Sequence, residues 1–405
     1  ALPILNIPAW NANAISIGRK PVNPALWRDD IYFAETTKFI GTREVVETVK
    51  AAYIMTQGTV GRTGFLGGVR GEDTATESGG WVRSRFASTV AEQNADPVGA
   101  ARRDYANNRR NLTGSYSKMF PSAHLTQDLT PNLKARLSWS NSFGRPPLSN
   151  LTPLETVNET NQTLTTNNPS LLPQTSKNWD ATLDYYFEPV GNVSIGWFHK
   201  TIKDYIVTGT NAGTIGTGTD NGFNGEYAGF TRLTSANAGT AIVQGWEFAY
   251  QQQFTFLPGW LKGLGASANF TVIATHGNFG GATERATDEV PGFIPRTASW
   301  GMSLNRERYT ARANWNYRSL QRRAPIAAGS SIEPGTYTWW SKRLYLDLNG
   351  EWNLTRRLAL FASIRNLADA PDDIKVFGPS TPAVARFRTR VEYGSLWSFG
   401  LKGTF

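Results

Sequence analysis

Histidine and cysteine, the residues most often used for metal binding and nucleophilic catalysis, are scarce in this chain. Its 405 residues include three histidines and no cysteine. His124, His199 and His276 fall in different predicted strands or at strand ends, so the pattern does not gather them. A single histidine on the polar face of a strand is typical of a structural or solvated side chain. The lack of cysteine removes thiolate metal sites and disulfides.

Other motifs that carry chemistry are incomplete. The glycine-rich stretches Gly209–Gly229 and Gly277–Gly281 lack the Lys-Ser/Thr pair of a phosphate-binding loop, and neither leads into a predicted helix. Asp372 and Asp373 offer carboxylates to calcium, but an adjacent pair without a third spaced acid is typical of a solvated turn. No nucleophile-elbow motif is present. We therefore predict no catalytic residue, no metal site, no cofactor and no enzyme activity.

One arrangement favours binding, because it combines cations with two tryptophans. Its members are Arg318, Arg322, Arg323, Lys342 and Arg343, with Trp339 and Trp340. Guanidinium groups stack on aromatic rings and pair with anions, so the set suits an anionic, ring-bearing ligand or a metal chelate. The same charges would also suit phosphates of a membrane surface, or simple solvation. The residue types leave these readings open.

The composition limits what kind of protein positions these residues. The chain is 40% apolar and 18% charged, and its formal net charge is +9. It is too long for one ordinary soluble core, and no run of about 18 apolar residues occurs, which excludes helical membrane spans. The basic residues are scattered without a long run, so we predict no nucleic-acid partner.

The last segment, Val391–Phe405, shows the pattern that repeats along the chain. Large apolar side chains alternate with small or polar ones, and the apolar set is Trp397, Phe399, Leu401 and Phe405. A strand with large apolar groups on one face and polar groups on the other suits the wall of a membrane barrel. The terminal strand of a soluble sandwich is the alternative reading of this segment alone.

Loop lengths decide between these alternatives. About 13 predicted strands, beginning with Val45–Thr56 and Phe65–Thr74, are joined alternately by short turns and long polar connections. The long connections are residues 75–108, 145–176, 204–240, 276–295, 320–341 and 367–390. Outer-membrane barrels have short periplasmic turns and long extracellular loops, whereas a sandwich has no reason to sort loop lengths by end. We predict an all-β, antiparallel transmembrane β-barrel of the bacterial outer membrane.

The strand pattern also assigns faces in the predicted pair near residues 343–365. The set expected to face lipid is Leu344, Leu346, Leu348, Trp352, Leu358, Leu360 and Ile364. Asp347, Glu351 and Arg365 are expected to face the lumen, because a shift of one residue would reverse every side chain.

Several strings in order resemble one family. They include GGVRGEDT (67–74), MFPSAHLTQDLTPNLKARLSWSNSFGRPPLSNLTP (119–153), NNPSLLPQTSKNWDATLDYYF (167–187), FHKTIKDYI (198–206), VQGWEFAYQQQF (243–254), IRNLADAPDD (364–373) and the terminal FGLKGTF. Together they resemble the carboxy-terminal barrel of TonB-dependent outer-membrane receptors, from about residue 45 to the end. The resemblance implies an amino-terminal plug, a TonB box and a barrel of about 22 strands.

The count of about 13 strands falls short of that barrel. An odd number cannot close a usual single-chain bacterial barrel. We predict that residues 45–405 are the carboxy-terminal portion of the barrel and that residues 1–44 are an irregular extracellular loop region or the end of an upstream strand. The plug and about nine strands are expected upstream. The wall should therefore have an open edge at Val391–Phe405, unless a second chain covers it.

The resemblance implies active uptake of a scarce nutrient, such as a ferric siderophore, a cobalamin or an oligosaccharide, powered by the inner-membrane TonB complex through the plug. The expected partners are this small-molecule ligand, outer-membrane lipid, lipopolysaccharide and the barrel-assembly machinery, which would read Trp397, Phe399, Leu401 and Phe405. The basic and aromatic set would lie at the extracellular mouth. The alternative is a passive, porin-like or structural barrel without a plug.

Overall fold

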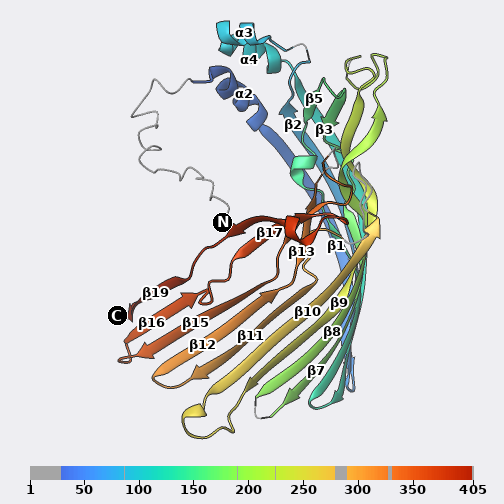
Figure 1. Ribbon diagram of the computed structural model, residues 1–405. Helices are drawn as coiled ribbons and strands as arrows, with labels where there is room; N and C mark the ends of the chain where they lie inside the picture. The colour runs from blue at the N-terminus through green and yellow to red at the C-terminus, as the bar shows by residue number, and fades with distance from the viewer. Residues whose placement is uncertain are drawn as a thin grey trace, which may run out of the picture.

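The computed structural model describes residues 29–85, 87–188, 190–223, 225–278, 290–326 and 331–403. Its main feature is a curved antiparallel wall, shown in Figure 1 as part of a cylinder. Thirteen strands follow one another in the order β1-β2-β3-β4-β7-β8-β9-β10-β11-β12-β15-β16-β19. This confirms the predicted fold class and the predicted number of wall strands.

Most wall strands are long, as expected for strands that cross a bilayer at a tilt, and the shortest, β16 and β19, have 8 residues each. Their bounds are β1 Arg43–Val60, β2 Thr63–Trp81, β3 Arg109–Thr130, β4 Leu133–Gly144, β7 Gln174–Phe187, β8 Gly191–Thr214, β9 Thr231–Gln253, β10 Leu264–Asn278, β11 Arg296–Asn305, β12 Tyr309–Arg318, β15 Arg343–Asn353, β16 Leu358–Arg365 and β19 Leu396–Gly403.

The two ends of the wall differ in their connections. At one end, here called the turn end, strands are joined by short segments such as residues 61–62, where Gly61 adopts a positive φ of 59° that suits a tight turn. At the other, the loop end, the connections are long. The strands reach farther into this end than predicted. β2 continues to Trp81 and the β8–β9 hairpin fills much of the stretch 204–240, since β8 ends at Thr214 and β9 begins at Thr231.

The register gathers apolar side chains on one face across neighbouring strands. One continuous row of paired positions runs through Tyr185, Val193, Tyr250, Ala268, Trp300, Trp315 and Leu346. Leu348 pairs with Ile364, and Ile364 with Trp397, so these three also share a face. The opposite face carries Asp347 and Glu351, which is the division that the alternation predicted.

Both edges of the wall are open among the described residues. β1 pairs only with β2, and β19 pairs only with β16. Because the number of wall strands is odd, these two edge strands run in the same direction and cannot close the sheet in the usual antiparallel way. The open edge was predicted. However, Val391 was wrongly placed in the last wall strand: it ends β18, and Gly394, with a positive φ of 67°, precedes β19.

The long connections hold structure where the sequence predicted loops. Helices α3 Val90–Ala95 and α4 Pro97–Tyr105 lie in the β2–β3 connection, near the loop end of β2, as Figure 1 shows. Helix α2 Ile31–Gly41 precedes β1, so this part of residues 1–44, predicted to be an irregular loop region or the end of an upstream strand, is helical instead. Strands β5 Glu155–Asn158 and β6 Thr163–Thr166 form a small hairpin that pairs with β9. Short 3₁₀ helices, η2 Leu148–Asn150, η3 Gly259–Leu261 and η4 Ala383–Ala385, lie in other connections.

A second sheet lies at the loop end, above the last wall strands (Figure 1). It has the order β13-β14-β17-β18 and is built from two connections that are far apart in sequence. The bounds are β13 Gln321–Pro325, β14 Tyr337–Trp340, β17 Asp372–Phe377 and β18 Phe387–Val391. We call these four strands the mouth sheet.

Helices are a minor component of the described residues. The longest, α2, has 11 residues, and none combines the length and the hydropathy that a bilayer-spanning helix needs.

Candidate functional site

The predicted basic and aromatic set lies where the mouth sheet meets the wall. Arg318 ends β12 and Arg343 begins β15, and the two residues are direct partners across these strands. Like charges in such a pair repel each other. The carboxylate of Asp372, at the start of β17, lies between them: it accepts a hydrogen bond from Arg318 Nη2 at 2.7 Å and from Arg343 Nη1 at 2.6 Å. Asp372 therefore neutralises one charge and ties the mouth sheet to the wall.

Each tryptophan of this set lies against at least one of its arginines. The guanidinium carbons of Arg323 and Arg318 are 4.1 and 4.9 Å from the ring centroid of Trp340. Arg322 is only 3% exposed, and its guanidinium carbon is 5.5 Å from the ring centroid of Trp339. Cations at these distances are attracted by the ring quadrupole. Trp339 and Trp340 are neighbours on β14, so these two groups of contacts lie on opposite faces of the mouth sheet. The whole set is here called the mouth cluster, with Lys342 exposed beside it.

Asp372 was interpreted wrongly from the sequence. The pattern indicated a solvated turn, whereas the structure makes Asp372 an anion held by two guanidinium groups. Asp373, its neighbour, pairs with Arg390 at 2.8 Å on the far side of the sheet. A ligand anion at the mouth cluster would have to share Arg318 and Arg343 with Asp372.

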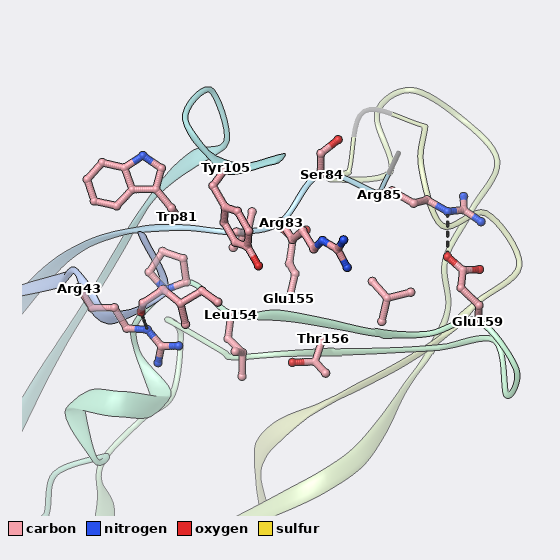
Figure 2. A pocket seen from close by; sticks show the side chains of 14 residues that line it. Arg43, Trp81, Arg83, Ser84, Arg85, Tyr105, Leu154, Glu155, Thr156 and Glu159 are labelled. Atoms are coloured by element: carbon pink, nitrogen blue, oxygen red, sulfur yellow. Dashed lines mark hydrogen bonds and ion pairs between the residues drawn. The ribbon is translucent and has the colours of Figure 1, made fainter. Parts of the chain in front are cut away.

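A second site, which the sequence did not reveal, is a pocket under α2 at the loop end. Figure 2 shows Arg43, Arg83 and Arg85 around a cavity that is closed from the other side by the β5 segment. Its volume is about 450 Å³, within the usual range for small-molecule sites. Trp81 and Tyr105 add aromatic surface to the lining. We call this the arginine pocket.

A buried carboxylate fixes one wall of the arginine pocket. Asp104 is 2% exposed and accepts hydrogen bonds from Tyr32 Oη at 2.5 Å and from the backbone N of Ser88 at 2.7 Å. Burial raises the pKa of Asp104, but these hydrogen bonds and the nearby Arg83 outweigh it, so the pKa lies below its usual value. Burial, together with the hydrogen bond to Asp104, raises the pKa of Tyr32 to about 12. Asp104 therefore stays ionised and holds α2 and Arg83 in place.

Ring stacking holds the helices over the pocket as well. Phe39 of α2 stacks on Tyr105 of α4, with ring centroids 5.8 Å apart and planes 11° apart, and it meets Trp81 edge to face at 6.2 Å. Such aromatic pairs add about 0.5–1.5 kcal/mol beyond their buried area. The helices were missed in the sequence although their signals are present: Thr89 and Glu92 form a capping box, and Asp96 precedes Pro97.

The acids of the pocket do not cancel its arginines. Glu155 pairs with Arg110 at 3.4 Å, and burial raises the pKa of Glu155 despite this cation. Arg85 Nε lies 3.6 Å from a carboxylate oxygen of the exposed Glu159. The guanidinium carbon of Arg85 also lies 5.2 Å from the ring centroid of Tyr227 and 4.9 Å from that of Phe230. With their ion-pair partners included, Arg43, Arg83, Arg85 and Arg110 stand against Asp104, Glu155 and Glu159, so the formal charge is 4 − 3 = +1. This is an electrostatic environment that favours an anion.

The loop that carries Phe230 forms the neighbouring core. Leu164, Ile215, Phe223, Tyr227 and Phe230 pack together as buried residues. Burial raises the pKa of Tyr227 to about 12, and the nearby Glu155 and Glu226 act in the same direction. The β8–β9 connection therefore closes over β6 as a packed unit and positions Arg85 from above.

The histidines and the terminal aromatics remain separate from both sites. His124 Nδ1 lies 3.0 Å from Ser138 Oγ on β4, and His199 Nδ1 lies 3.0 Å from Gln244 Oε1 on β9. Among the described residues, no three His, Asp or Glu side chains are grouped as metal ligands. Trp397, Phe399 and Leu401 lie exposed along β19, while Phe405 is outside the described residues.

Comparison with known proteins identifies the family to which this architecture belongs. A wall of long antiparallel strands, apolar on one face, with short turns at one end and long connections at the other, is the architecture of an outer-membrane β-barrel. The family model "TonB dependent receptor-like, beta-barrel" matches residues 19–367. The chain belongs to this family of outer-membrane transporters and receptors and lies in the bacterial outer membrane. No curated protein matches the sequence.

Solved structures agree on the fold. The ferric-catecholate import receptor Fiu from E. coli K12 has a TM-score of 0.61 and 14% identity, and the match covers 89% of this chain and 45% of Fiu. The ferric citrate transporter FecA has a TM-score of 0.57 and 12% identity, and the match covers 89% of this chain and 45% of FecA. The siderophore receptor PiuA from Acinetobacter baumannii has a TM-score of 0.57 and 14% identity, and the match covers 89% of this chain and 44% of PiuA. The chain thus spans about half the length of these receptors, and the similarity shows the shared fold.

Proposed function

We propose that this chain forms the ligand-facing part of an active importer that takes up a scarce, anionic small molecule across the outer membrane. The observation that carries the proposal is the arginine pocket, where Arg43, Arg83 and Arg85 line a cavity of about 450 Å³ at the loop end. In outer-membrane barrels this end faces the outside of the cell. A ligand arriving there meets guanidinium groups and aromatic rings first.

The chemistry of the pocket favours a ligand with acidic and planar groups. Each guanidinium has five N–H donors in a fixed fork, so an arginine that already has one acceptor still offers donors to a carboxylate or phenolate oxygen. Trp81 and Tyr105 offer ring faces for stacking. An anionic ferric chelate combines these features, and similar folds include receptors named for ferric catecholates and ferric citrate.

The mouth cluster is proposed as a second contact for the same ligand. Arg318, Arg322, Arg323, Trp339, Trp340, Lys342 and Arg343 lie at the loop end of the opposite part of the wall. Exchange of Asp372 for a ligand anion between Arg318 and Arg343 would release the mouth sheet from the wall. The cluster would then bind and respond to the ligand in one step.

A paired set of variants tests the pocket. Arg43→Gln with Arg85→Gln removes two guanidinium groups, and each lost charged hydrogen bond should cost about 1.5–3 kcal/mol of ligand affinity, which is about tenfold to hundredfold in Kd. Arg388→Gln, an exposed arginine of β18, is the matched control. Ferric citrate and a ferric catecholate serve as probes. Equal affinities in the double variant and the control would reject the pocket as the binding site.

We further propose that residues 45–405 act as one barrel portion, that transport depends on the TonB complex through a plug, and that the protein catalyses no bond chemistry. Family membership supports this choice over a passive, porin-like or structural barrel. The proposed partners otherwise are lipopolysaccharide, other outer-membrane lipid and the barrel-assembly machinery. Ligand flux that is independent of TonB would favour the passive alternative.

A further inference from the structure

Three neighbouring turns at the turn end of the wall are strongly basic. They join β9 to β10, β11 to β12 and β15 to β16, which are adjacent pairs in the sheet order, and Figure 1 shows them side by side along the lower edge. Their cations are Lys262, Arg306, Arg308, Arg356 and Arg357, and their one acid is Glu307, so the formal charge is 5 − 1 = +4. We call these three turns the basic rim.

The other short turns do not share this charge. The β1–β2 turn contributes Arg62, the β3–β4 turn contributes no charge, and the β7–β8 turn contributes Glu188, so their sum is zero. Charge is therefore concentrated under one part of the wall. A uniform need for soluble turns would not produce this difference.

Four of the five cations of the basic rim have no acid partner within the described structure. No described carboxylate forms a salt bridge with Lys262, Arg308, Arg356 or Arg357, whereas Lys134 and Lys402, also near the turn end, each have an acid partner, at 3.3 and 3.1 Å. Arg306 is held differently, because its guanidinium donates to the carbonyl oxygens of Lys262 and Gly259 at 2.9 and 3.0 Å. This clamp fixes the β9–β10 turn against the β11–β12 turn and keeps the cations close together.

Large apolar side chains stand among these cations. Trp260 and Phe256 in the β9–β10 connection are 72% and 65% exposed, and Leu354 in the β15–β16 turn is 49% exposed. The apolar face of the wall ends close to these turns, where Trp352 pairs with both Tyr309 and Leu360. Exposed aromatics beside lysine and arginine are typical of segments that lie in the headgroup region of a bilayer.

We propose that the basic rim is a binding surface for anionic phospholipid headgroups in the inner leaflet of the outer membrane. Trp260, Phe256 and Leu354 would enter the acyl boundary, and the four cations without acid partners would contact lipid phosphates. The short-turn end of an outer-membrane barrel faces the periplasm, so the basic rim lies at the level of that leaflet. The surface is distinct from the ligand sites at the loop end.

The test measures lipid preference at the basic rim itself. Because the chain has no cysteine, Thr255→Cys in the full-length protein, with any cysteine outside this chain replaced, gives one site for a fluorophore in the β9–β10 connection. The labelled protein is reconstituted in mixtures of phosphatidylcholine and phosphatidylglycerol in which one lipid is brominated, and quenching gives the relative binding constant. We expect phosphatidylglycerol to be preferred at least about fivefold, the effect of one cation near a lipid surface, with the preference decreasing as salt is raised.

Three variants locate the preference. The combined variant Lys262→Gln, Arg308→Gln, Arg356→Gln, Arg357→Gln should abolish it. The combined variant Arg308→Lys, Arg356→Lys, Arg357→Lys should retain it. Arg62→Gln, in a turn outside the basic rim, should leave it unchanged. Heat-modifiable migration on gels checks that each variant is folded. An equal preference for both lipids in the parent protein, a preference that survives the fourfold Gln variant, or an equal loss in Arg62→Gln would overturn the proposal. The first result would be expected if the basic rim instead served an acidic periplasmic protein.

Discussion

Replacing Asp372 with asparagine should loosen the mouth sheet from the barrel wall. The carboxylate accepts hydrogen bonds from Arg318 and Arg343, whose side chains are 14% and 23% exposed, while its own is 22% exposed. Hydrogen bonds to charged groups contribute about 1.5–3 kcal/mol, and breaking a buried ion pair costs about 3–5 kcal/mol. Asparagine keeps one acceptor oxygen, and the site is partly solvated. We therefore expect a loss of about 2–3 kcal/mol in the local free energy of opening.

Hydrogen exchange measures this loss directly. The backbone amides of β17, residues 372–377, should exchange about 30 to 150 times faster in Asp372→Asn, because each 1.4 kcal/mol is about tenfold in the opening equilibrium. Asp373→Asn is the matched control, since Asp373 pairs with an arginine whose side chain is 50% exposed. Exposed ion pairs contribute about 0–1 kcal/mol, so the control should change exchange by at most about fivefold. Equal effects of the two substitutions would refute the assigned role of Asp372.

Three other predictions follow from the sites and the wall. Because burial raises the pKa of Glu155, this acid becomes neutral at a higher pH than an ordinary glutamate does. The affinity for an anionic chelate should therefore rise as the pH falls. In a titration of ligand binding, Glu155→Gln should remove that dependence. Spin labels at Leu348 and Asp347 should report opposite oxygen and water accessibility, and equal values would contradict the lipid-facing register. Deletion of Phe405 should lower the yield of folded, heat-modifiable protein in the outer membrane, and a normal yield would show that the assembly signal was misread.

The wall could be predicted because the alternation of apolar and polar residues that marks each strand lies within that strand's own sequence. In β12, Ala311, Ala313 and Trp315 alternate with Thr310 and Arg312, and this period of two needs no knowledge of the partner strand. Turn and loop lengths alternate along the chain in the same visible way. Hairpin pairing between consecutive strands then fixes the order of the sheet.

The mouth sheet and the arginine pocket could not be predicted in this way. β14 has only four residues, and its partner β17 comes from a different connection, so no local period marks either strand. The role of Asp372 depends on the pairing of Arg318 with Arg343, which is a property of the register. Arg83 and Arg85 stand two residues apart beside Trp81, a visible hint, but only the folded β5 segment turns them into a pocket.

The central claim, energised import of an anionic ligand, is tested most directly by uptake into cells. Cells that express the full-length receptor are given radioactive iron as ferric citrate or as a ferric catecholate, with the TonB complex present or deleted. We predict accumulation of at least one chelate that requires TonB and that falls at least about tenfold in the Arg43→Gln, Arg85→Gln variant. Accumulation at the same rate without TonB, or unchanged in that variant, would contradict the account.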